Sequence, residues 1–139
     1  MIHRVLLLSS LLTLLACKGA GESRCSHCGM KIEANSAFRA EIAPPSGAPL
    51  VFDTPRCAIL SFRADAGPGA KLRVQEFYDR SFQEASELRF VVGSDVVGPM
   101  GPDYIPVSPP LTPKFLKDHA GERVLTLAEI RGDEWKTAP

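Results

Sequence analysis

The sequence predicts an α+β domain made of two similar halves, each with the order strand, strand, helix, strand. Short runs of alternating apolar and charged residues are typical of half-buried strands. At two places, Thr54 and Thr112, a Thr-Pro pair precedes a run of apolar residues at helical spacing. Threonine suits the N-cap of a helix and proline suits its first position. The 139 residues include 12 prolines and 11 glycines, which favours one domain with short elements and many turns.

The N-terminus is typical of an exported lipoprotein. Residues 1–16 contain a short basic region and then an apolar run that is shorter than the ~20 residues of a membrane span. The run ends in Leu-Leu-Ala-Cys at Cys17, which resembles the lipobox of bacterial lipoproteins and implies cleavage before a lipidated Cys17. The alternatives are an ordinary cleaved signal with an incidental cysteine, or a retained anchor. We therefore expect a protein anchored in the bacterial cell envelope and facing the periplasm.

A flexible tether and the first half of the domain follow. Residues 17–24 are polar and contain glycine, as expected for a tether. The first half, residues 25–80, contains two strands predicted at 37–42 and 50–52 around a proline- and glycine-bearing turn. A helix over 55–64 and a strand from residue 71 to residue 78 complete it.

The second half, residues 81–139, repeats this order. A strand is predicted over 88–92, and a second over 104–107, which contains a proline and therefore suits a sheet edge. A helix over 112–120 and a final strand over 123–127 follow, before a polar tail that holds the single tryptophan, Trp135. The repeat is one of element order rather than of residue identity.

The hexad, residues 25–30 with the sequence Cys-Ser-His-Cys-Gly-Met, concentrates metal-binding side chains. Thiolate and thioether sulfur are soft ligands that select Cu(I), zinc or iron–sulfur groups. Cys17 aside, the chain has three cysteines, Cys25, Cys28 and Cys57, in a compartment where disulfides persist. Because an odd number of thiols cannot all pair within one chain, at least one is free, metal-bound or joined to another molecule.

Two residues outside the hexad are candidates for the same site. Cys57 lies in the first turn of the first predicted helix, where the helix dipole lowers the pKa of a thiol; the alternative is a small buried core residue. Met100 lies in Gly98-Pro99-Met100-Gly101, a poor place for a core residue. Its thioether either folds over a metal held by the hexad or packs on the edge of a sheet.

The hexad, read as Cys-x-x-Cys-Gly-Met, and the segment 96–107, Val-Val-Gly-Pro-Met-Gly-Pro-Asp-Tyr-Ile-Pro-Val, together resemble the NosL family of nitrous-oxide-reductase accessory lipoproteins. The resemblance implies a lipid-anchored Cu(I)-binding protein with two ββαβ halves, which delivers copper and is not an enzyme. The implied client is apo nitrous oxide reductase or a related exported copper enzyme. The positions that match the family's copper ligands are Cys28, Met30 and Met100, and Cys25 is a further candidate ligand at a position where relatives often lack a cysteine.

Several alternatives remain open from the residues alone. Cys25 and Cys57 either tighten Cu(I) binding or form a disulfide beside the site. His27 is either a further ligand or a solvent-facing side chain, and His119 is expected to end the second helix, where a basic residue favours the dipole. A structural zinc site could use the three cysteines and a histidine, and a redox protein could use Cys25 and Cys28 as its dithiol.

Charge and motif content exclude other classes. Lys+Arg and Asp+Glu both number 16, so the chain lacks the basic excess that nucleic-acid binding requires. No nucleophile–base pair stands out in the sequence, which argues against a hydrolase. We therefore expect no nucleic acid and no small-molecule substrate among the partners.

Overall fold

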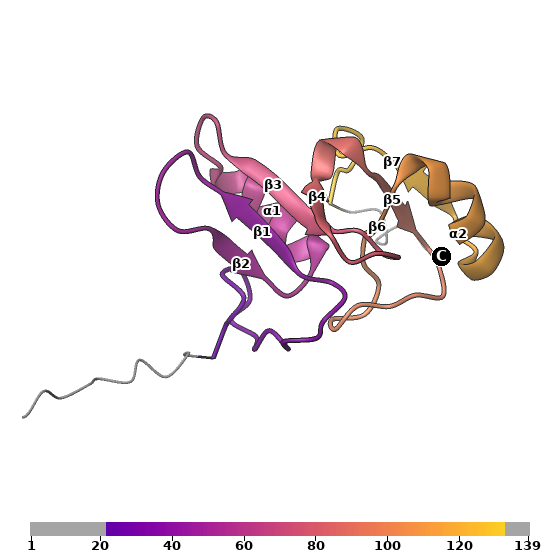
Figure 1. Cartoon of the computed structure of the whole chain (residues 1–139), viewed down its shortest axis with the longest axis horizontal. Helices are drawn as coiled ribbons and strands as arrows, with labels where there is room; N and C mark the ends of the chain where they lie inside the picture. The colour runs from indigo at the N-terminus through magenta and orange to yellow at the C-terminus, as the bar shows by residue number, and fades with distance from the viewer. Residues whose placement is uncertain (1–21, 133–139) are drawn as a thin grey trace, which may run out of the picture.

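The computed structural model describes residues 22–132 and confirms the α+β class, with two antiparallel sheets that lie side by side (Figure 1). The predicted signal peptide of residues 1–16, the lipidated Cys17 and the tail with Trp135 lie outside the described residues. The first sheet consists of strands of the predicted first half and one strand, residues 82–84, from beyond the predicted boundary at residue 80, whereas the second sheet lies wholly within residues 81–139. One helix packs against each sheet.

The first half has the predicted order of elements. They are β1 (Ala40–Ala43), β2 (Leu50–Phe52), α1 (Pro55–Asp65) and β3 (Lys71–Gln75). Strand β1 pairs antiparallel with both β2 and β3, so it lies between them. Thr54 is the N-cap of α1 and Pro55 opens the helix, as the sequence predicts.

The second half repeats this arrangement. Its elements are β5 (Arg89–Val92), β6 (Ile105–Val107), α2 (Thr112–His119) and β7 (Arg123–Leu125). Strand β5 lies between β6 and β7 as β1 lies between β2 and β3, and β6, with its proline, is an edge strand as predicted. Because the order of strands within each sheet is the same, the two halves share their topology as well as their element order.

Three elements of the structure were not predicted. They are β4 (Phe82–Glu84) and the short 3₁₀ helices η1 (Ala85–Glu87) and η2 (Pro109–Leu111). Strand β4 pairs with β3 and so extends the first sheet beyond residue 80. The prediction that Thr112 caps α2 as Thr54 caps α1 is wrong. The chain enters α2 directly from η2, and the Thr112 hydroxyl donates to the Ser108 carbonyl at 3.2 Å.

The central strand of the second sheet, β5, is buried on both faces. Phe90 and Val92 belong to the main core, which includes Ile59 of α1 and Val74 of β3. Val91 points the other way into a second cluster beneath α2, with Phe115 at its centre. The second sheet is therefore packed between the first half and α2, and the two halves share one core.

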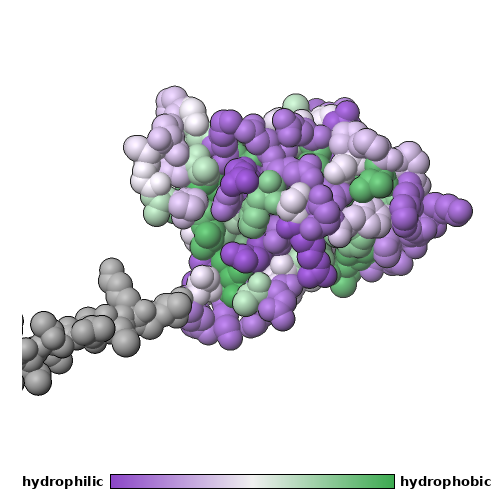
Figure 2. All heavy atoms as spheres, in the orientation of Figure 1, coloured by the Kyte–Doolittle hydropathy of each residue, from purple (hydrophilic) through white to green (hydrophobic). Residues whose placement is uncertain are grey.

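The surface carries no broad apolar area on the face drawn in Figure 2, where hydrophilic residues surround smaller apolar patches. Among residues 22–132, no helix has the length and apolar character needed to cross a bilayer. Met30, Val97 and Met100 are notable because they are large apolar side chains with 41%, 60% and 47% exposure.

A buried carboxylate joins the two halves. Glu76, at the end of β3, is fully buried, and its Oε2 accepts from the backbone N–H groups of Tyr78 and Asp79 at 2.7 and 3.0 Å. Its Oε1 accepts from the N–H of Ser108, which precedes η2, at 3.1 Å. These charge-assisted bonds satisfy backbone donors from both halves around one side chain.

We predict that Glu76→Ala lowers the free energy of unfolding by about 2–4 kcal/mol, because three backbone donors lose a charged acceptor. Urea unfolding under reducing conditions measures this. The matched control is Glu87→Ala in η1, which removes an exposed carboxylate and should stay within about 0.5 kcal/mol of the native protein. Equal effects of the two substitutions would contradict the assigned role of Glu76.

Candidate metal centre

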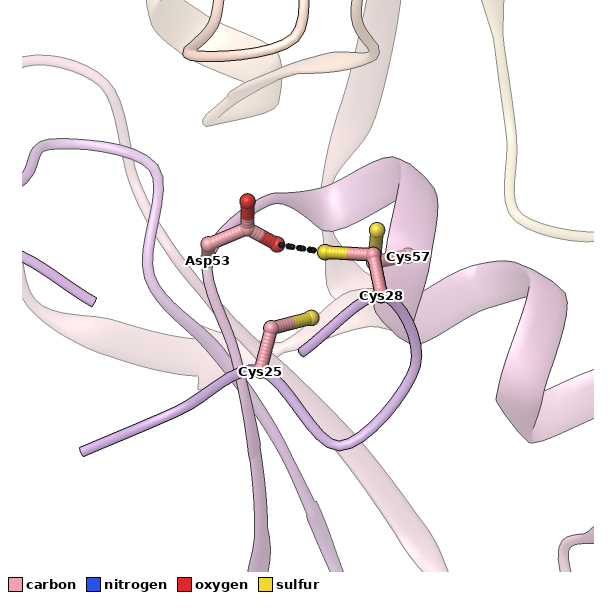
Figure 3. Close-up of side chains that lie close together, drawn as sticks. All are labelled: Cys25, Cys28, Asp53 and Cys57. Carbon is pink, nitrogen blue, oxygen red and sulfur yellow. Dashed lines mark hydrogen bonds between the residues drawn. The ribbon is translucent and has the colours of Figure 1, made fainter. Parts of the chain in front are cut away.

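The hexad forms a closed loop. The N–H of Cys25 donates to the Met30 carbonyl at 2.8 Å, and the N–H of Gly29 donates to the Cys25 carbonyl at 2.9 Å. Gly29 has φ +77°, a left-handed conformation that glycine adopts without a Cβ penalty. This turn brings Cys28 back toward Cys25, so that both sulfur atoms face the same side of the loop (Figure 3).

The loop packs where β2 ends and α1 begins. The N–H of Ser26 donates to the carbonyl of Val51 in β2 at 2.8 Å. Asp53 follows β2 directly, and Thr54 accepts from the N–H of Cys57 at 3.1 Å as the helix cap. The strand end and the first turn of the helix thereby place a carboxylate and a third thiol beside the hexad.

Four side chains form what we call the Cys–Asp cluster: Cys25, Cys28, Asp53 and Cys57. Their ligand atoms all lie within 4.8 Å of one another (Figure 3). The Cys28 thiol donates to Asp53 Oδ1 at 3.6 Å. All three cysteines are free, and the fourth member is a carboxylate where the zinc alternative expected a histidine.

The three thiols differ in their solvent exposure. Cys25 and Cys57 are each 3% exposed, whereas Cys28 is exposed at the surface. Burial is the main cause that raises the pKa of Cys57, with the nearby Cys25 and Asp53 charges adding to it. Burial, followed by a hydrogen bond with Asp53, raises the pKa of Cys25 as well.

The prediction of a lowered pKa for Cys57 is therefore wrong, because burial of the thiol disfavours its charged form and raises the pKa. Cys57 is buried, as the alternative interpretation expected, and it also lies within the Cys–Asp cluster. At neutral pH, Cys25 and Cys57 are consequently protonated thiols. A metal ion bound by these thiols would displace their protons.

Met100 belongs to a tight loop that reaches the cluster from the second half. Gly98 and Gly101 exchange backbone hydrogen bonds of 2.8 and 3.0 Å, which leaves Pro99 and Met100 at the tip. The Met100 Sδ lies 3.8 Å from the Sγ of Cys57. Met100 therefore contacts Cys57, the thiol of the cluster that lies outside the hexad, and the Cys57 sulfur in turn lies within 4.8 Å of those of Cys25 and Cys28.

A buried carboxylate of the second half holds this loop against α1. Asp103 Oδ1 accepts from the N–H of Arg56, in the first turn of α1, at 3.0 Å and from the N–H of Tyr104 at 2.7 Å. A Cβ at Gly98 would lie 2.9 Å from Asp103 Oδ2, so the loop approaches the carboxylate as only glycine allows. Burial is the main cause that raises the pKa of Asp103 to about 7.

The remaining candidates lie around the cluster rather than in it. The Met30 carbonyl accepts the hydrogen bond from Cys25 that closes the hexad loop, and Met30 itself is 41% exposed. His27 Nδ1 lies 2.9 Å from Ser61 Oγ on α1 and is outside the cluster of described ligand atoms. His119 ends α2, as predicted. Asp53 was missed by the sequence analysis, although its place between a strand and a helix cap, four residues before Cys57, was a usable signal.

Fold and site together define the class: a small α+β domain with two ββαβ halves and a cluster of candidate metal ligands at their junction. The chain belongs to the NosL family, whose sequence profile matches residues 17–135. Its fold is similar to the crystal structure of the copper chaperone NosL from Shewanella denitrificans. The TM-score is 0.63 at 23% sequence identity, over 78% of this chain and 89% of that chain. No curated protein sequence matches this chain.

The raised pKa of Asp103 predicts a specific pH dependence of stability. Between pH ~4 and ~7 the unfolded state releases this proton and the folded state keeps it, so rising pH favours unfolding across that window. Asp103→Asn keeps an acceptor for Arg56 and Tyr104 but cannot ionise. Relative to this variant, the native protein should lose a few kcal/mol as pH rises from ~4 to ~7, at about 1.4 kcal/mol per pKa unit, with no further change above.

Urea unfolding at a series of pH values measures this difference. Asp65→Asn, on the exposed part of α1, is the matched control and should follow the native profile. A constant difference between native protein and Asp103→Asn across the window would contradict the assignment.

Proposed function

We propose that this chain is a lipid-anchored protein that binds Cu(I) on the periplasmic side of the membrane and delivers it to an exported copper enzyme. It is a metal-delivery protein rather than an enzyme. The observation that carries the proposal is the contact between the Met100 thioether and the thiol of Cys57. Membership of the NosL family and similarity in fold to a copper chaperone support it. By the family resemblance, the client is apo nitrous oxide reductase.

The ligand types suit Cu(I). Cys28 and Met100 offer soft sulfur from the two loops, and Cys25 and Met30 add to the hexad side. Cys57 joins this set because its sulfur is the one that Met100 contacts. Thioether sulfur needs no deprotonation, so the methionines remain competent ligands at any periplasmic pH.

The arrangement of exposed and buried sulfur suits transfer. Cys28, Met30 and Met100 are exposed, so a partner protein can reach them. The buried thiols of Cys25 and Cys57 supply further ligands on the interior side of the site. An ion held this way can exchange its outer ligands for those of a partner before its inner ones leave.

The redox alternative fits less well. An oxidoreductase dithiol has a thiol whose pKa is lowered, which makes it a good nucleophile. Burial instead raises the pKa of Cys25, one of the two cysteines of that motif. Cys25 is also only 3% exposed, so its thiol is a poor attacking group, which favours metal binding over thiol–disulfide exchange as its task.

We predict that Met100→Leu weakens Cu(I) binding by about 10-fold or more, because it removes a soft ligand and keeps the apolar volume. Anaerobic titration against a competing Cu(I) chelator measures the affinity. Val97→Leu changes another exposed apolar side chain of the same segment and should bind Cu(I) as the native protein does. Unchanged Cu(I) affinity in Met100→Leu would show that the loop containing Met100 is not part of the site.

We also predict that Cys17 carries the lipid. Cells grown with labelled palmitate should label the native protein and the Cys28→Ala variant, and should fail to label Cys17→Ala. The reason is that lipoprotein acylation uses the cysteine at the cleavage site, which the lipobox places at Cys17. Label retained in Cys17→Ala, or absent from the native protein, would refute the anchor.

A further inference from the structure

We propose that residues 95–103 form a latch, which is held on α1 while Asp103 keeps its proton and opens when Asp103 ionises. The latch is a property of the protein without metal, so the inference does not rest on the proposed function. On the proposed function, opening of the latch would also take the Met100 thioether away from Cys57. A rise in pH would then favour release of the ion.

The latch has few contacts that hold it closed. None of residues 95–102 is buried, and the two backbone hydrogen bonds between Gly98 and Gly101 lie within the latch itself. At its first end, Asp95 and His119 of α2 form an exposed side-chain pair at 3.1 Å, and the N–H of Asp95 donates to the His119 carbonyl. A segment with so little buried surface opens at a lower free energy than the whole domain unfolds.

Asp103 holds the other end of the latch against the first half. Its side chain is buried, and its Oδ1 accepts from the N–H of Arg56, in the first turn of α1, at 3.0 Å. The contact between the Met100 Sδ and the Cys57 thiol, a weak donor, adds little to this hydrogen bond. The state of the Asp103 carboxyl group therefore decides whether the latch stays closed.

The second oxygen of Asp103 makes the closed latch sensitive to ionisation. This Oδ2 is buried without a hydrogen-bond partner among the described residues, and a Cβ at Gly98 would lie 2.9 Å from it. A neutral carboxyl group is buried there at a lower cost than a carboxylate, which loses its hydration. Because water would reach Oδ2 once the latch leaves α1, ionisation favours the open form.

The groups around Asp103 give the direction and range of the pH dependence. Burial is the largest cause that raises its pKa to about 7, although the N–H groups of Tyr104 and Arg56, the Thr54 hydroxyl and the Arg56 charge lower it. An aspartate in water has a pKa of ~4. Between these values the closed latch keeps a proton that the open latch releases. Rising pH therefore favours opening by up to ~10-fold per pH unit in this window, with no further change above it.

Other titratable groups lie near both ends of the latch. Asp53 and Cys57 lie on either side of Thr54 and Arg56 in the chain, and burial raises the pKa of the Cys57 thiol, so it stays protonated throughout this window. At the first end, loss of a proton from His119 would weaken its pair with Asp95 and would also loosen the latch as pH rises. A test must therefore separate the effect of Asp103 from that of His119.

Amide hydrogen exchange provides this test, measured by NMR between pH ~5 and ~8 in the mature protein without metal and under reducing conditions. The N–H of Arg56 donates to Asp103, whereas the N–H of Cys57, next in the same turn, donates to the Thr54 hydroxyl. After correction for the intrinsic exchange rate of each amide, the opening constant at Arg56 should rise by about 10-fold or more. The opening constant at Cys57 should change by less than about 3-fold. This comparison needs no variant.

Two variants assign the effect to one residue. Asp103→Asn keeps an acceptor for the N–H of Arg56 but cannot ionise, so its opening constant at Arg56 should be independent of pH. The matched control, His119→Asn, removes the other titratable group that holds the latch and should keep the native pH profile at Arg56.

Four results would each overturn the inference: an opening constant at Arg56 that does not change with pH in the native protein, an equal rise at Cys57, a rise that persists in Asp103→Asn, or a rise that is lost in His119→Asn. The Cu(I) titration of the native protein decides the proposed function separately, because the exchange measurement uses no metal. Either proposal can therefore fail while the other stands.

Discussion

Both the fold and the site depend on the hydrogen bonds that complete the first turn of α1. Backbone N–H groups at the start of a helix have no partner within the helix, and a buried helix start must find acceptors elsewhere. One acceptor is local, the Thr54 hydroxyl, which takes the N–H of Cys57. The other is the carboxylate of Asp103, which comes from the second half and takes the N–H of Arg56. The interaction that completes the helix therefore also places the Met100 loop over Cys57.

The two halves share a topology but contribute differently to the site. In the first half, the helix begins with a capped turn that carries Cys57, directly after Asp53. In the second half, α2 is entered through η2 and its first turn has no side-chain cap and no cysteine. The first half thus supplies every thiol and the carboxylate, and the second supplies a thioether and the carboxylate that clamps it. Because β5 is buried on both faces, this junction is held within one core.

Local patterns allowed the strands and helices to be predicted, since each depends on neighbours in sequence. The alternation around Ala40 and Ile42 and the Thr54-Pro55 start of α1 are of this kind, and the structure confirms them. Strand β4 is short, with every residue half-buried, and owes its existence to pairing with β3. Contacts between polar side chains far apart in the sequence were also not predicted, because they depend on tertiary packing. Asp53 contacts Cys28 only because the hexad packs on the end of β2. The sign of the Cys57 pKa shift depends on burial, between which and an accessible first-turn thiol the sequence alone left the choice open.

Depth within the site constrains how an ion can leave it. Cys25 and Cys57, at 3% exposure, cannot be approached by ligands of another protein without opening the core, and Cys57 is further fixed by its helix. On the proposed function, exchange would then proceed through the exposed sulfur atoms, those of Cys28, Met30 and Met100. Of these, Met100 is the one mounted on a loop from the other half, held by Gly98 against Asp103. On the proposed function, withdrawal of that loop would take the Met100 thioether away from Cys57, so the contact of Asp103 with this loop and with α1 would influence how readily the ion is released.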